Sequence, residues 1–461
     1  MITDILQDKK VLFADGAATE LRAQVNRRRV AVCTMGNLTG NLRADEKGVC
    51  ARVFKNGVYG FSSAAELSGE AAEKVLKEAT LNADFMGTHV PRPQVRRAAV
   101  PSGAYTAPHD IRDNEQKLYV DTARRLDEYL TSRYPDLVSH TVRAYEDSQE
   151  KLLVTSDGCD AHILAPRSYV YIFMTAQTPQ GQPVELFEAV GGEGTFDVNF
   201  RTDDALHDAA DRIYENLMKK REGVFADAGE KTVILGGIMT GMLSHEAVGH
   251  TVEADIVKGG SVAGHLLGQQ VASEKVSLTD FAHTAFGARC PLPVFADDEG
   301  TLAADAPLIR DGILTGYMNS RESAAAYGRQ PLGNARAWAF SDEPLIRMRN
   351  TAIHPGTDKL EDMIASVDDG YYLLSSTNGQ ADTTGEFMFG VSLGYEIKHG
   401  KLGRALLDTT VSGVAFDMLK TVDMVSDEVI WSSSGFCGKK QPMPVGMGGP
   451  ALRCRIRIGG R

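Results

Sequence analysis

Apolar and polar residues alternate over much of the first part of the chain, as is typical of half-buried strands. The alternation runs through residues 30–62, where Asn56-Gly57 is a strong signal for a two-residue hairpin turn. Ala, Glu and Leu dominate residues 64–83, which predicts a helix. Residues 91–110 carry several prolines, and we expect a linker there.

Beyond this linker the periodicity changes between helix and strand several times. A helix over 112–132 would have its apolar residues roughly on one face. These residues are Leu118, Ala123, Leu126 and Leu130. The further elements that we expect are strands at about 140–155 and 168–176, a turn at Ser156-Asp157-Gly158 between them, a helix at 203–222, a strand at 232–236, and a helix directly after that strand.

The pattern divides the chain into two parts. The helix at 203–222 ends in three basic residues, which suits a helix C-terminus, and we place the main boundary there. Residues 1–225 are expected to form an N-terminal α/β domain, a mixed sheet with helices, in two sub-parts around the linker. Residues 226–461 show short strands with frequent glycine turns, which predicts a β-rich, barrel-like or sandwich domain. The expected fold class is therefore α+β.

Composition narrows the class of protein. With 461 residues the chain is too long for one ordinary core. It carries 49 Lys and Arg against 61 Asp and Glu, a net charge of −12, which argues against broad nucleic-acid binding. Six cysteines are scattered without C-x-x-C spacing, which favours a reducing compartment. We expect a cytoplasmic protein without a signal peptide or membrane span, because the longest apolar run, 233–243, is too short.

Candidate chemistry centres on residues 245–250, which read His-Glu-Ala-Val-Gly-His. Two histidines with a glutamate between them are a zinc-site pattern, but the usual spacing is i and i+4. On a regular helix, residues at i and i+5 are separated by about 140° rather than about 40°. His245 and His250 could reach one metal if a π-bulge distorts the helix or if the helix terminates at Gly249. A chance match with a solvated His-Glu pair is the alternative.

Cys437 is the candidate for a third ligand. It lies in Ser434-Gly435-Phe436-Cys437-Gly438-Lys439, where the flanking glycines would let the backbone approach another element. One cysteine and two histidines form an accepted ligand set for catalytic zinc, which leaves a position open for water. The alternative is a small buried apolar residue, as we expect for Cys454 on the apolar face of a strand.

These motifs resemble those of the TldD/PmbA family, also described as gyrase modulators, over nearly the whole chain and on the TldD side. The combination of 245–250 with the distant cysteine is specific, whereas the glycine-rich segments are individually weak. Thr251 to Asp255 departs from the glycines expected in relatives, which concerns substrate preference more than metal binding. The segments that carry the resemblance are 48–54, 57–61, 245–250, Glu253, Asp255, 297–301, 379–382, 385–387, 437–439, 444–446 and 449–450.

The resemblance implies a metallopeptidase that hydrolyses small or unfolded peptides. It implies that His245, His250 and Cys437 bind one Zn²⁺ per chain and that Glu246 is the general base. If Glu246 is not the base, Glu253 is the next candidate. It also implies a homodimer, or a heterodimer with a paralogue that lacks the metal motif. A non-catalytic peptide-binding partner subunit of such a complex is the alternative function.

Substrate binding can also be anticipated. An enzyme that accepts varied unfolded peptides should hold their backbone, by adding the peptide as a strand to an exposed sheet edge. The strands flanking Gly379 to Phe389 could supply that edge, although their glycines could equally serve only as turns. We expect selectivity to come from a site enclosed within a dimer.

Other charged or histidine-containing segments are expected to be ordinary surface. Asp297-Asp298-Glu299 could bind a hard cation, but a solvated acidic turn is the favoured interpretation. The basic clusters Arg27-Arg28-Arg29 and Arg96-Arg97 are expected to be solvated, as are His265, His283 and His354. The chain contains no P-loop, which argues against nucleotide binding, and we expect no Gly-x-Ser-x-Gly nucleophile elbow of the serine hydrolases.

Overall fold

A computed structural model describes residues 2–6, 8–90, 95–100, 103–106 and 112–459. Its N-terminal half is built on one long, curved sheet with the strand order β3-β2-β1-β5-β6-β4, and β7 pairs with β6. The strands are β1 (Ala18–Thr34), β2 (Asn37–Lys55), β3 (Val58–Ala64), β4 (Gly103–Thr106), β5 (Ser139–Thr155), β6 (Cys159–Gln177) and β7 (Pro183–Glu193).

The predicted hairpin at Asn56-Gly57 is confirmed. Both residues have positive φ angles, 53° and 83°, and they join β2 to β3 in the register Lys55 to Val58. Such angles at both central positions suit the right-handed twist of paired strands, and Asn-Gly accepts them at little cost. The sequence pattern did not reveal how early β1 begins, and it did not show β7.

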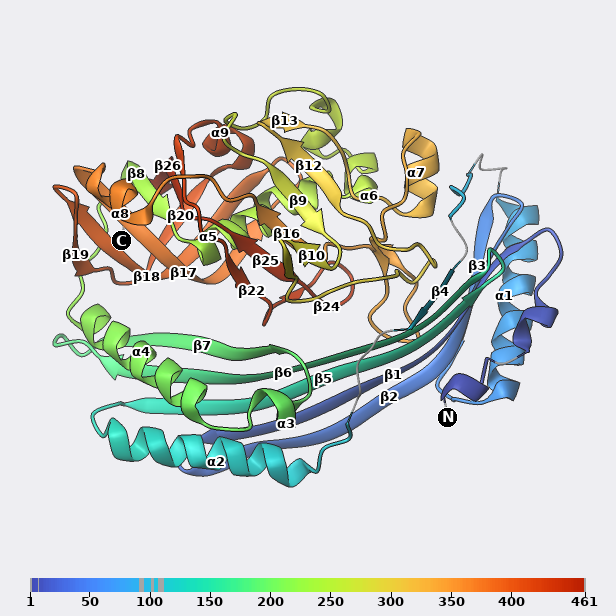
Figure 1. The fold of residues 1–461 in the computed structure, drawn as a ribbon, viewed down its shortest axis with the longest axis horizontal. Coiled ribbons are helices and arrows are strands. Elements are labelled where there is room, and N and C mark those ends of the chain that lie inside the picture. Colours follow the sequence, from blue (N-terminus) through green and yellow to red (C-terminus); the bar gives the residue numbers. More distant parts are fainter. Residues whose placement is uncertain (1, 7, 91–94, 101–102, 107–111, 460–461) are drawn as a thin grey trace.

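Helices cover the outer face of this sheet (Figure 1). The predicted helix at 64–83 is observed as α1 (Gly69–His89), whose apolar side packs on β2 and β3 at one end. At the other end α2 (Gln116–Arg133) and α4 (Asp204–Arg221) pack on β5, β6 and β7, with the short α3 (Phe196–Asn199) before α4. The expected face of α2 is buried at Ala123, Leu126 and Leu130, whereas Leu118 is half-buried. The expected linker contains β4; its residues 91–94, 101–102 and 107–110 lie outside the described residues.

The C-terminal half contains a five-stranded closed barrel, which confirms the α+β class and the barrel-like domain. The ring runs β17-β8-β26-β20-β18 and closes because β17 also pairs with β18. A closed ring leaves fewer open edges than a flat sheet of the same strands. The ring strands are β8 (Gly229–Leu235), β17 (Asp369–Ala381), β18 (Glu386–Lys398), β20 (Thr409–Val414) and β26 (Leu452–Ile458), and β19 (Lys401–Ala405) and β21 (Met424–Val425) pair with them.

A second sheet and several short elements complete this half. The second sheet has the order β13-β12-β9-β16-β25-β22. Its strands are β9 (Leu278–Phe281), β12 (Ala306–Arg310), β13 (Ile313–Leu314), β16 (Asn350–Ile353), β22 (Ile430–Ser432) and β25 (Gly446–Gly449). Two-stranded pairs are formed by β10 (Thr284–Ala285) with β11 (Ala288–Arg289), β14 (Ala335–Arg336) with β15 (Leu345–Ile346), and β23 (Phe436–Cys437) with β24 (Met443–Pro444). The helices of this half are α5 (Gly237–Met242), α6 (Ala254–Lys258), α7 (Arg321–Tyr327), α8 (Leu360–Ala365) and α9 (Ala415–Lys420), with single turns η4 (His250–Val252) and η5 (Val262–His265) and the π-helical η3 (Leu243–Gly249). Two further single turns, η1 (Ile2–Asp4) and η2 (Lys9–Leu12), precede β1 in the N-terminal half.

The two halves meet through buried ion pairs, and this corrects the expectation of a solvated acidic turn at 297–299. Asp298 is paired with Arg22 and Lys151 of the long sheet, each at 3.0 Å. Glu299 is paired with Arg52 at 2.6 Å. A buried carboxylate remains charged only when cations and N–H groups surround it, and the inner face of the sheet supplies them.

The two basic clusters that were expected to be solvated also contain arginines held in buried ion pairs. Arg29 is buried and paired with Asp45 and Asp113, and Arg97 is nearly buried beside Glu20. Their neighbours Arg28 and Arg96 are exposed, as expected. An arginine triplet on a strand sends alternate side chains to opposite faces, so the cluster could not be solvated as a unit.

Histidine and cysteine positions complete the comparison with expectation. His265 is exposed, but His283 and His354 are half-buried, and His354 Nε2 lies 2.8 Å from Thr279 Oγ1. All six cysteines are free and buried, including Cys454 on the inner side of β26. In the parts of the chain that the structure describes, no helix is long and apolar enough to cross a membrane.

Candidate metal centre

The helix that follows β8 has the distortion that the histidine spacing requires. After one and a half turns of α5, the chain widens into the π-helical segment η3, and the His250 N–H donates a hydrogen bond to the His245 carbonyl, an i to i+5 bond. A π-turn takes up one residue more than an α-turn, so residues five apart come onto one face. The π-bulge prediction is confirmed. The alternative, termination at Gly249, is wrong because Gly249 remains helical with φ −54°.

Gly249 has a packing role instead. A β-carbon at this position would lie 2.2 Å from Met348 Sδ and 3.0 Å from the Ser244 carbonyl oxygen. No real β-carbon approaches a heavy atom so closely, so the side chain of Met348 or the helix would have to shift. Glycine therefore allows the widened turn to lie against its neighbour.

The structure brings the three candidate ligands together. The potential ligand atoms of His245, His250 and Cys437 all lie within 4.8 Å of one another. Cys437 Sγ is 3.3 Å from His250 Nε2, and the two imidazole rings are nearly perpendicular. Tetrahedral zinc with Zn–N near 2.0 Å and Zn–S near 2.3 Å places its ligand atoms about 3.3–3.6 Å apart, so small side-chain movements would complete the geometry.

His245 provides the clearest sign that this cluster is incomplete as protein alone. The residue is 1% exposed, and neither ring nitrogen has a hydrogen-bond partner among the described residues. A buried imidazole without partners is costly, and natural proteins rarely contain one without a ligand, an ion or water. The set of two imidazoles and one thiol fits a metal such as zinc.

The charge states around Cys437 also fit a cation site. Burial disfavours the thiolate, but contacts with His245 and His250 outweigh it and lower the pKa of Cys437 to about 4. Burial likewise disfavours the His250 imidazolium, but its contacts with Cys437 and Glu253 raise the pKa to about 10. The cluster therefore stabilises a thiolate with a positive charge beside it, and a metal ion would take the place of that proton.

Glu253 lies behind His250, not in the groove. Its Oε2 is 2.7 Å from His250 Nδ1, and its side chain is fully buried. Lys439 lies 3.1 Å from the other carboxylate oxygen and also pairs with Asp255. A carboxylate that accepts from the distal nitrogen fixes the tautomer and orientation of a ligand histidine. This geometry argues against Glu253 as a substitute base.

Glu246 is the carboxylate that lies both in the groove and beside the histidines. Its two oxygens lie 3.9 Å from His245 Nε2 and 3.7 Å from His250 Nε2, and its side chain is 26% exposed. Glu246 and His250 line an open groove with an empty volume of about 1020 Å³. The opposite wall contains residues 379–383 at the end of β17.

The Cys437 hairpin is fixed by residues that the sequence did not suggest. The buried Arg347 donates hydrogen bonds to the carbonyls of Cys437, Lys439 and Gln441 at 2.6–2.8 Å. From the long sheet, Tyr169 and Tyr171 donate to the carbonyls of Ser433 and Ser434, each at 2.8 Å. These contacts join segments far apart in the chain, so spacing alone carries no signal for them. Cys437 itself lies in a short paired strand, β23, rather than in the loop that was expected.

Comparison with known proteins assigns the chain to a family. The description "PmbA/TldA metallopeptidase" matches it in three successive domains: domain 1 over 19–83, the central domain over 109–234 and the C-terminal domain over 228–460. A protein named metalloprotease from Methanothermobacter thermautotrophicus is 31% identical, and the match covers 98% of this chain and 96% of that one. This chain belongs to the PmbA/TldD family.

Further PmbA/TldD relatives agree with this assignment. A protein named metalloprotease TldD homolog from Haemophilus influenzae is 28% identical over the whole chain and 95% of its own length. The crystal structure of TldE from Thermococcus kodakarensis has the same fold, with a TM-score of 0.79 over the full length of both chains at 16% identity. A structure named a putative modulator of a DNA gyrase, from Thermotoga maritima, has a TM-score of 0.77 at 18% identity and covers 99% of both chains. The curated names support a metallopeptidase family, whereas the structural likenesses show the fold.

Proposed function

We propose that this protein is a metal-dependent peptidase whose metal, zinc, is held by His245, His250 and Cys437. The observation that carries this proposal is His245, which is buried beside a thiol of lowered pKa and a second imidazole, and whose ring nitrogens have no hydrogen-bond partner in the described parts of the chain. A zinc ion, when bound, supplies a Lewis acid that polarises the scissile carbonyl and lowers the pKa of the attacking water.

The residues around the centre have distinct roles in this proposal. Glu246 accepts the proton of a water in the groove and passes it to the leaving amine, because it is the carboxylate that faces both the groove and the histidines. Glu253 keeps the His250 Nδ1–H directed away from the groove. Lys439 balances the charge of buried Glu253, which would otherwise be costly.

The substrate would be held by its backbone along β17. This strand pairs with β18 over residues 369–381 but with β8 only over 370–373. Beyond residue 373, β8 has turned into α5 and η3, and residues 379–383 at the end of β17 line the same groove as Glu246 and His250. A peptide could add to this edge as a strand, which suits varied sequences. Gly379 lies in this part of β17. A β-carbon at this position would lie 2.7 Å from the ring of Phe389 on β18, so glycine lets the two strands pack closely there.

Small and unfolded peptides are the proposed substrates, and a dimer is the proposed assembly, either of two copies or with a paralogue that lacks the metal motif. An extended strand is the conformation that the edge requires, and a folded protein rarely presents one free. A partner that covers the groove would restrict access further. The proposed location is the cytoplasm.

A digestion series tests this proposal. One polypeptide is offered folded and unfolded, together with short peptides, to the metal-loaded protein and to the same protein after chelation. We expect cleavage of the unfolded chain and the short peptides, and none after chelation. Equal cleavage of rigid folded segments would contradict the enclosed site, and cleavage at one fixed sequence would contradict backbone binding. Tight peptide binding without any cleavage would instead establish the non-catalytic partner subunit.

A further inference from the structure

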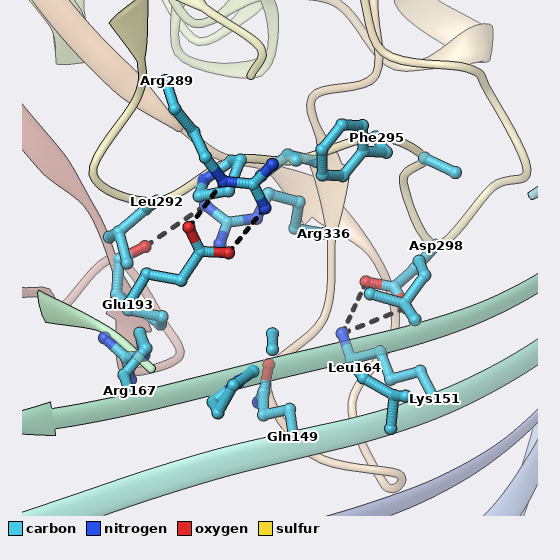
Figure 2. A pocket seen from close by; sticks show the side chains of 17 residues that line it. Gln149, Lys151, Leu164, Arg167, Glu193, Arg289, Leu292, Phe295, Asp298 and Arg336 are labelled. Carbon is cyan, nitrogen blue, oxygen red and sulfur yellow. Dashed lines mark hydrogen bonds and ion pairs between the residues drawn. The ribbon is translucent and has the colours of Figure 1, made fainter. Parts of the chain in front are cut away.

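A second cavity lies between the two halves of the molecule, apart from the metal groove. It has an empty volume of about 800 Å³, part of it open to solvent. Its floor is formed by β5 and β6 of the long sheet, and its other walls by residues 289–298, Arg336 and Pro444 (Figure 2). Pro444 belongs to β24, the strand paired with the Cys437 hairpin. Boundaries between packed units are frequent places for small-molecule sites.

The walls of this cavity carry more cations than carboxylates. Lys151, Arg167, Arg289 and Arg336 line it, against Glu193 and Asp298. Both carboxylates are already engaged by cations, and Figure 2 shows the two pairs on different sides of the cavity. Glu193 accepts two hydrogen bonds from Arg289 at 2.7 Å, and Asp298 accepts from Lys151 at 3.0 and 3.2 Å.

Arg336 is left without a carboxylate. Its Nη1 donates to the carbonyls of Met348 and Pro444, at 2.7 and 3.3 Å, and among the described residues no carboxylate lies within 4.0 Å of its guanidinium. Burial and the neighbouring cation Arg347 lower the pKa of Arg336 to about 9. Arg167, which also lines the cavity, has its Nη2 paired with Asp147, whereas its buried Nη1 has no hydrogen-bond partner within the described ranges. A guanidinium in such a setting gains most from a bound anion.

The rest of the lining is apolar. Ile163, Leu292, Val294, Phe295 and Pro444 contribute side chains around the cationic groups. An inorganic anion would leave these surfaces facing water, whereas an organic anion with an apolar body would cover them. We propose that this cavity binds a small organic carboxylate, whose carboxylate pairs with Arg336 and whose apolar part lies against the Phe295 wall.

Such a carboxylate has two chemical sources: a free aliphatic or aromatic acid, or the C-terminus of a short peptide. The site is separate from the metal cluster, so the inference does not depend on peptidase activity. Titration calorimetry with the full chain can compare four probes: hexanoate, its uncharged amide, N-acetyl-leucine and N-acetyl-leucinamide. We expect each acid to bind at least tenfold more tightly than its amide. Tighter binding of either acid supports the site and identifies the source.

Variants locate the binding. Arg336→Gln should weaken binding of the acids at least tenfold, and Arg404→Gln, which removes an exposed arginine on β19, should not change it. Ala165 lies opposite Gln149 on the cavity floor, so Ala165→Leu fills space without altering charge and decides the question if Arg336→Gln does not fold. Binding of acids no tighter than of amides, or binding unchanged in Arg336→Gln or in Ala165→Leu, would overturn the proposal.

Discussion

Two buried polar groups in this molecule, the Asp298 carboxylate and the His245 imidazole, differ in whether protein atoms satisfy them. At the junction of the halves, Asp298 is held by Arg22, Lys151 and the Ala337 N–H. At the candidate metal centre, His245 is also buried, but its ring has no hydrogen-bond partner among the described residues. A completed network stabilises one arrangement of the chain, whereas an incomplete one is retained where a ligand completes it. The contrast separates structure from function better than burial or charge alone.

Removing the groove carboxylate should have the largest effect. We expect Glu246→Gln to lower kcat roughly 10²- to 10⁴-fold, because the side-chain shape is kept while the base is lost. The metal content should remain one ion per chain, since Glu246 is not a proposed ligand. The measurement is peptide hydrolysis with metal analysis of the same sample. The control is Glu70→Gln, which changes an exposed glutamate on α1. Retained activity would move the base elsewhere.

Breaking the completed cluster should destabilise the fold without changing the metal centre. Asp298→Asn leaves Arg22 and Lys151 without their carboxylate, and we expect a loss of about 3 kcal/mol in the free energy of unfolding. Asp369→Asn removes an exposed pair with Lys398 and should cost less than about 1 kcal/mol. Denaturant unfolding measures both. Equal effects of the two substitutions would show that burial is not what gives the junction its strength.

The residue behind His250 should have an intermediate effect. Glu253→Gln removes the charge that orients the imidazole, and we expect metal affinity to fall about 10- to 100-fold with the stoichiometry retained at saturation. Competition with a chelator of known affinity provides the measurement. Unchanged affinity would mean that the carboxylate serves only to pair with Lys439.

Acid should weaken the junction in a defined window. Although burial opposes the charged form, Lys151 and Arg22 lower the pKa of Asp298 to about 2 from 3.8. A carboxyl whose folded pKa is depressed contributes stability above its unfolded pKa and loses it as the pH falls through the folded pKa. We therefore expect about 2 kcal/mol to be lost between roughly pH 4 and pH 2. In Asp298→Asn the free energy of unfolding should lack this loss between roughly pH 4 and pH 2. The same dependence on pH in the variant and the unchanged protein would show that Asp298 is not its source.

Local patterns could be predicted from the sequence, and long-range contacts could not. The hairpin at Asn56-Gly57, the helix at 204–221 and the pairing of His245 with His250 depend on residue types and spacings visible in one chain. Cys437, which lies 187 residues from His250, was added by its glycine-flanked setting and by the family resemblance rather than by spacing. The acidic triplet at 297–299 was misjudged because its partners lie far away in the chain: Lys151 is 147 residues from Asp298, and Arg52 is 247 residues from Glu299. Nothing in the spacing indicated that Arg347 would fix the Cys437 hairpin, for the same reason.

The central claim is that His245, His250 and Cys437 form one metal site, and metal stoichiometry tests it most directly. The purified protein should contain one zinc ion per chain, lose it to a chelator and recover it on addition of zinc. His245→Ala and Cys437→Ala should each abolish stoichiometric binding, whereas Cys454→Ala, which removes a buried cysteine in β26, should retain it. Unchanged stoichiometry in His245→Ala or Cys437→Ala would contradict the account.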